Sequence, residues 1–92
     1  MADLLHEFWR GETDGEFGRV SAEGDRLRAK VSPELRFVFE VWADSSREAR
    51  RLYEERAYGE FGKTYDHLPD MIYIDEEAAS QLTFLRIRAN VR

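Results

Sequence analysis

Two short stretches of this chain have the residue types that bind nucleotide phosphates. Residues 57–64 read AYGEFGKT, which is the spacing of a phosphate-binding P-loop with Ala57 in place of the first glycine. Residues 71–76 read MIYIDE, an apolar run that ends in acids, as in strands whose aspartate holds Mg²⁺. In a P-loop, backbone amides and a helix N-terminus surround the phosphates, and the lysine reaches the outer ones.

The sequence around these stretches argues against a nucleotide site. A P-loop leaves a strand and enters a helix, whereas residues 57–64 follow a predicted helix. The connection from Lys63 to Asp75 is also too short for a complete crossover between parallel strands, which needs about a dozen residues or more. We therefore interpret Gly59 as the end of a helix. Nucleotide or phosphate binding by residues 57–64 with Asp75 remains an alternative hypothesis.

A second group with chemical potential is His67, which lies among the acids of residues 66–77. Histidine with carboxylates can bind a metal ion or share a proton. However, no other histidine stands at ligand spacing, and no set of nucleophile, base and orienting group can be named. The sequence therefore predicts neither a metal site, nor a cofactor, nor an enzyme.

Composition restricts the classes of protein that remain. The chain has 92 residues, of which 42% are hydrophobic, and this predicts one compact domain over residues 1–92. Its net charge of −5, from 14 basic and 19 acidic residues, disfavours general binding to nucleic acid or anionic lipid. With no cysteine, no signal-peptide pattern and no long apolar run, we expect a cytoplasmic protein of bacterial type that does not enter a membrane.

The clearest elements lie in the middle of the chain. Residues 35–43 read LRFVFEVWA, whose period of two and aromatic and β-branched residues predict a strand. Residues 45–58 have the spacing of an amphipathic helix. Ser45 and Glu48 form a capping-box pattern at its start, and Gly59 suits its end.

The flanking segments complete a prediction of the α+β class. We expect a β-hairpin over residues 17–31, a short strand over 71–74 and a second short helix from residue 76. Residues 1–10 fit a helix or a strand, with a strand preferred, and residues 83–91 fit either. The predicted fold is a small, mostly antiparallel sheet with the 45–58 helix packed on one face.

The strand over residues 35–43 also predicts a surface for another protein. On strict alternation, Val38 and Trp42 lie opposite the core face, which comprises Leu35, Phe37, Phe39 and Val41. A tryptophan beside arginine and valine on a second sheet face is typical of an interface anchor. Alternatively, the first segment or a second helix covers that face. The leading hypothesis is a non-enzymatic interaction or regulatory protein that binds another protein, or a second copy of itself, through Trp42, Val38, Arg36 and Trp9.

A third hypothesis is binding of nucleic acid. Arginines and a lysine recur on predicted strands and near the end of the chain, at Arg26, Arg28, Lys30, Arg36, Arg86, Arg88 and Arg92. Aromatic side chains on a sheet can stack on unpaired bases. The negative net charge and the lack of an RNA-recognition strand motif weigh against this hypothesis.

Overall fold

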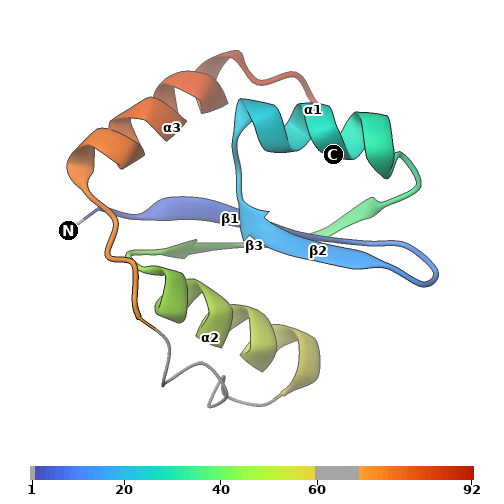
Figure 1. The fold of residues 1–92 in the computed structure, drawn as a ribbon, viewed down its shortest axis with the longest axis horizontal. Helices are drawn as coiled ribbons and strands as arrows, with labels where there is room; N and C mark the ends of the chain where they lie inside the picture. The colour runs from blue at the N-terminus through green and yellow to red at the C-terminus, as the bar shows by residue number, and fades with distance from the viewer. Residues whose placement is uncertain (1, 60–68) are drawn as a thin grey trace.

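A computed structural model of the protein describes residues 2–59 and 69–92, and these residues form a mixed α+β domain (Figure 1). This confirms the predicted fold class. The described elements are, in chain order, β1 (Leu4–Arg10), β2 (Gly15–Arg19), α1 (Ala22–Val31), β3 (Arg36–Ala43), α2 (Ser46–Tyr58) and α3 (Asp75–Ile87). No helix in this part of the chain combines the length and apolar character that a membrane crossing requires.

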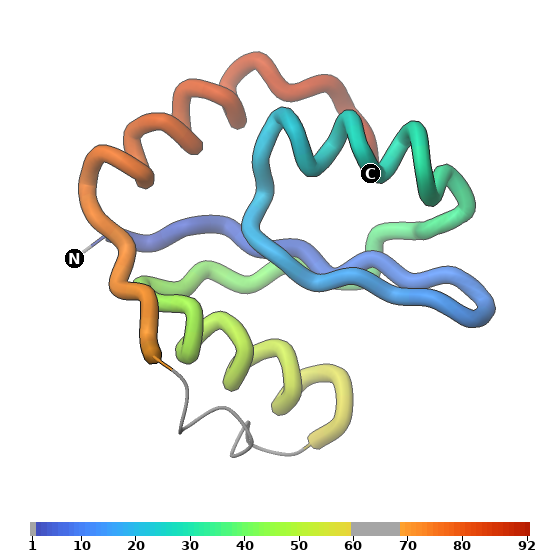
Figure 2. The backbone as a smooth tube through the Cα atoms, in the orientation of Figure 1, coloured from blue at the N-terminus to red at the C-terminus, as the bar shows by residue number. Residues whose placement is uncertain are grey.

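The three strands form an antiparallel sheet in the order β2-β1-β3. Helices α1 and α3 lie on one face of the sheet, and α2 lies on the other (Figures 1 and 2). Because β1 is central and both faces are covered, residues 4–9 are all buried. The preference for a strand near the N-terminus is confirmed over residues 4–10.

The prediction of a hairpin over residues 17–31 is wrong. Strand β2 forms its hairpin with β1, and residues 22–31 form helix α1. Ser21 is the N-cap of α1, and its side-chain oxygen accepts a hydrogen bond from the Gly24 amide at 3.0 Å. The alternating apolar residues of this segment do not mark a buried strand face, since Leu27 is 46% and Val31 71% exposed.

The predicted helix over residues 45–58 is confirmed as α2. The Ser45 hydroxyl accepts a hydrogen bond from the Glu48 amide at 3.1 Å, so Ser45 is the N-cap. Gly59 adopts a left-handed conformation with φ 74°, and its amide donates to the carbonyl of Glu55. The Glu48 carboxylate bonds to Arg51 instead of completing a capping box.

The C-terminal third differs in detail from the prediction. The expected strand over residues 71–74 is reduced to one bridge between Ile72 and Ser45, because the chain turns into α3 directly after Ile74. The helix expected from residue 76 begins at Asp75 and continues to Ile87. Residues 88–92 then form a tail without regular structure, and this tail reaches α1 (Figure 2).

A β-bulge in β3 changes which side chains share a face. Phe8 pairs with Phe39 whereas Trp9 pairs with Phe37, so Val38 has no partner on β1. Phe37 therefore lies on the face of Trp9, with the two rings edge to face at 5.9 Å. The prediction that Phe37 shares a core face with Phe39 is wrong, because the bulge interrupts the period of two.

The two faces of the sheet are packed by different chemistry. Under α2 the core is aromatic: the Tyr53 ring lies 4.5 Å from that of Phe17 and 5.0 Å from that of Phe8. Phe8 also contacts Phe39 at 5.3 Å. The opposite face, beneath α1 and α3, includes charged side chains and is where most of the buried ion pairs occur.

Candidate functional site

The centre of the α1 and α3 face is the carboxylate of Glu7, whose side chain is 2% exposed. It accepts hydrogen bonds from Trp9 Nε1 at 3.0 Å and from both terminal nitrogens of Arg88 at 2.8 and 2.7 Å. Arg92 Nε adds another at 2.9 Å. Arg88 also bonds to Asp25 of α1 at 2.7 and 2.9 Å. This network joins the central strand, α1 and the C-terminal tail.

The network holds Glu7 in its ionised form. Burial alone would raise the pKa of this carboxyl group, but the hydrogen bonds from Arg88, Trp9 and Arg92 outweigh burial and lower the pKa to about 2. The same contacts raise the pKa of Arg88. Because Glu7 stays charged and fully bonded near neutral pH, it is suited to fixing the fold and not to proton transfer.

The ion pairs also bear on the hypothesis of nucleic-acid binding. Arg28 bonds to Glu16 at 3.3 Å and to Asp25 at 2.8 Å, and Arg88 and Arg92 are held by carboxylates as described. Phosphate contacts through these arginines would require buried or half-buried ion pairs to break. Three of the six arginines named in the sequence are thus held by carboxylates within the fold, while Arg26, Arg36 and Arg86 are exposed.

Of the four residues predicted to form an interaction surface, three are exposed on β3 and the fourth, Trp9, is buried. Val38 is 42% and Trp42 47% exposed, and both belong to β3. Arg36 is exposed at the start of the same strand. Trp9 is only 5% exposed, because it belongs to the central strand and the guanidinium of Arg28 lies 3.7 Å above its ring.

The outer edge of β3 is where exposed backbone and exposed apolar side chains meet. The Glu40 carbonyl accepts a hydrogen bond from Arg56 Nη1 at 2.8 Å, and the Asp44 carbonyl accepts one from the Tyr73 amide at 2.9 Å. Alternate residues of an antiparallel strand direct both backbone groups to the same side, so Glu40, Trp42 and Asp44 face this edge. In the described part of the chain, no strand lies beside Glu40 and Trp42 there.

Exposed apolar residues continue from β3 onto the segment that pairs with its end. Met71 is 53% and Ile72 62% exposed, and the Met71 carbonyl accepts a hydrogen bond from the Ser46 amide. Arg56 lies 4.4 Å above the Phe39 ring, and within residues 2–59 and 69–92 it has no carboxylate partner. We call this region the β3 edge surface, comprising Val38, Trp42, Arg56, Met71 and Ile72.

His6 is buried on β1 and is fully hydrogen-bonded. Its Nε2 lies 2.7 Å from the Tyr73 hydroxyl and its Nδ1 lies 3.0 Å from the Leu4 carbonyl. Burial, assisted by the charges of Arg19 and Arg50, lowers the pKa of His6 to about 4. The neutral ring then donates from Nδ1 to Leu4 and accepts the Tyr73 proton at Nε2, which is the arrangement of a structural histidine.

The alternative phosphate site is only partly described. Ala57 and Tyr58 form the last turn of α2, while residues 60–64 lie outside the described residues, as do Asp66 and His67. Asp75 is the first residue of α3 and does not follow a regular strand. Within the described ranges, no group of three or more histidines and acids is arranged to hold a metal ion.

Sequence reasoning did not identify the residues that connect the layers. Glu7, Asp25 and Arg88 match no motif, and neither does Gln81, whose amide bonds to both backbone groups of Leu5 and to the Val20 carbonyl. One signal was present: Glu7 interrupts the apolar run LLHEFW, and a charge at a buried strand position requires a partner.

A comparison of the chain with protein-family models, curated proteins and solved structures finds no match.

Proposed function

We propose that this protein is a non-enzymatic interaction protein that binds an extended segment of another protein along the β3 edge surface. The observation that supports this most directly is the exposure of Val38 and Trp42 on a strand whose outer edge, among residues 2–59 and 69–92, has no neighbouring strand beside Glu40 and Trp42. Strand addition uses such an edge, since main-chain hydrogen bonds provide affinity and alternate side chains provide specificity.

The chemistry of the surface defines the segment that would fit. Trp42 offers a large apolar contact of the kind that dominates interfaces, and Met71 and Ile72 extend the apolar area. Arg56 has only a main-chain carbonyl as its hydrogen-bond partner among the described residues. The complementary segment therefore has apolar residues at alternate positions and an acidic residue that pairs with Arg56.

Two features limit what the edge accepts. The bulge at Val38 interrupts the regular spacing of backbone groups along β3, and the Arg56 side chain already donates a hydrogen bond to the Glu40 carbonyl. Proteins use bulges and charged side chains in this way to prevent indiscriminate pairing of edge strands. An incoming segment has to replace the Arg56 hydrogen bond, and an acidic side chain that captures Arg56 offsets this loss.

Selection from a library of displayed short peptides tests the proposal. We expect enriched peptides to alternate apolar residues around an aspartate or glutamate. Their affinity should fall at least about tenfold for the Val38→Ala, Trp42→Ala variant. The matched control is Ile87→Ala, which truncates an apolar residue that is 79% exposed on α3 and should leave binding unchanged.

The same variants distinguish binding of another protein from binding of a second copy of this chain. If sedimentation shows a concentration-dependent dimer that the double variant abolishes, a second copy occupies the edge and the proposed partner is wrong. The absence of enriched peptides, or equal binding to wild type and the double variant, would also overturn the proposal.

A further inference from the structure

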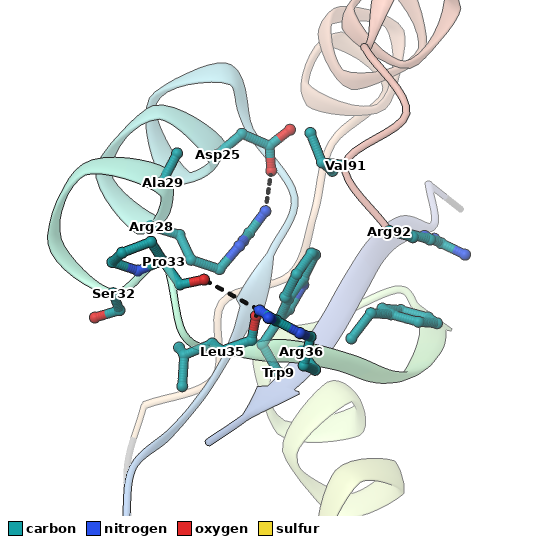
Figure 3. A pocket seen from close by; sticks show the side chains of 11 residues that line it. Trp9, Asp25, Arg28, Ala29, Ser32, Pro33, Leu35, Arg36, Val91 and Arg92 are labelled. Carbon is teal, nitrogen blue, oxygen red and sulfur yellow. Dashed lines mark hydrogen bonds and ion pairs between the residues drawn. The ribbon is translucent and has the colours of Figure 1, made fainter. Parts of the chain in front are cut away.

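A groove separate from the β3 edge surface lies between the C-terminal end of α1, the start of β3 and the C-terminal tail (Figure 3). Its volume is about 430 Å³, within the range of small-molecule sites. The apolar part of its lining comes from Trp9, Ala29, Pro33, Leu35, Phe37 and Val91. The groove therefore offers an apolar and aromatic wall of the size that accommodates a small organic molecule.

Three arginines line this groove, but only Arg36 lacks a carboxylate partner among the described residues. Arg28 is paired with Asp25 and Glu16, and Arg92 is paired with Glu7 and Glu40. Arg36 Nη1 donates to the carbonyls of Pro33 and Leu35, both at 3.2 Å. Its Nε and Nη2 donors, which form the side of the guanidinium that binds carboxylates in parallel, have no partner in the described residues.

The local charge decides between a carboxylate and a multiply charged phosphate. The charges of the ionised side chains in and around the groove sum to zero, since four arginines face four acids: Arg28, Arg36, Arg88 and Arg92 with Glu7, Glu16, Asp25 and Glu40. The groove also borders the C-terminal end of α1, where the helix dipole disfavours negative charge. A polyphosphate would bring an excess of negative charge, whereas a single carboxylate needs only Arg36.

We propose that this groove binds a small monocarboxylate with an apolar or aromatic body. The carboxylate pairs with Nε and Nη2 of Arg36, and the body lies against Trp9, Pro33 and Val91. This inference does not depend on the β3 edge surface, because neither Val38 nor Trp42 lines the groove.

The intrinsic fluorescence of Trp9 offers a direct test. The chain has two tryptophans, so Trp42→Phe leaves Trp9 as the only one. In this background we expect 3-phenylpropionate to change the fluorescence saturably, with a Kd of about 1 mM or lower. The neutral isostere 3-phenylpropionamide should bind at least about tenfold more weakly, since it has no charge and only one acceptor oxygen to offer the guanidinium.

Variants at Arg36 identify the anchor. Arg36→Met should lower the affinity for the acid at least about tenfold and leave the affinity for the amide unchanged. Arg36→Lys should lower the affinity for the acid less, because lysine retains the positive charge. Arg26→Met is the matched control, since Arg26 is an exposed arginine of α1 that does not line the groove. Far-ultraviolet circular dichroism establishes that each variant is folded. Equal affinity for acid and amide, no saturable change, or full binding by folded Arg36→Met would overturn the inference.

Discussion

At the residue scale, Glu7 shows why a carboxylate is retained inside the sheet. Its charge is compensated by Arg88 and Arg92 from the tail and by the indole N–H of Trp9. Asp25 shares Arg88, so the carboxylates of β1 and α1 are joined through one guanidinium. A buried charge is tolerated only where such partners exist, and it penalises any packing that separates them.

We expect Glu7→Gln to lower the free energy of unfolding by roughly 3 kcal/mol, because Arg88 and Arg92 would lose their buried counter-charge. Urea denaturation followed by circular dichroism measures this change. The control Glu23→Gln, at an exposed position of α1, should alter stability by less than about 0.5 kcal/mol. A loss as small as the control's would mean that the network does not hold the layers together.

At the element scale, local signals predicted some parts of the fold and failed for others. Helix α2 follows from Ser45 and Gly59, which act within one turn of its ends. The same kind of signal at Ser21 marks α1, but the brief apolar alternation over residues 27–31 was mistaken for a strand. In β3, the alternation correctly placed Trp42 on the face opposite Val41, whereas the bulge at Val38 has no sequence signature.

For the candidate sites, too, features set by neighbours in the sequence could be predicted, whereas features that depend on contacts between distant residues could not. The periodicity of one strand placed Val38 and Trp42 opposite the face of Phe39 and Val41, but whether another element covers them could be read only from the fold. The Glu7 network was not predictable, since Arg88 lies 81 residues away in the chain and only the packed fold brings the two together. The groove at Arg36 likewise requires the end of α1 and the tail to converge on β3.

At the scale of the whole molecule, the buried His6 couples stability to pH. Its pKa is about 4 in the folded protein and near 6.5 in the unfolded chain, so the unfolded chain binds more protons between these values. The contribution of neutral His6 is therefore complete above pH 6.5 and is lost as the pH falls towards 4. Between pH 6.5 and pH 4 the free energy of unfolding should fall by roughly 3 kcal/mol from this group. Glu7 adds a separate loss at lower pH, below its ordinary pKa of 4.5.

Urea denaturation of wild type should accordingly show falling stability from pH 7.5 to 5.5, a range above the titration of Glu7. His6→Asn removes the titrating ring and should flatten this dependence, although it lowers stability at every pH. An unchanged slope in His6→Asn would assign the pH dependence to another group.

Hydrogen exchange measured by NMR, on the free protein and on its complex with a selected peptide, shows directly whether the outer edge of β3 receives another strand. In the free protein, the amides of Glu40 and Trp42 should exchange quickly, whereas that of Val41, which faces β1, should be protected. Peptide binding should slow exchange at Glu40 and Trp42 by at least about tenfold. Protection confined to other elements, with exchange at Glu40 and Trp42 unchanged, would show that no strand is added at this edge.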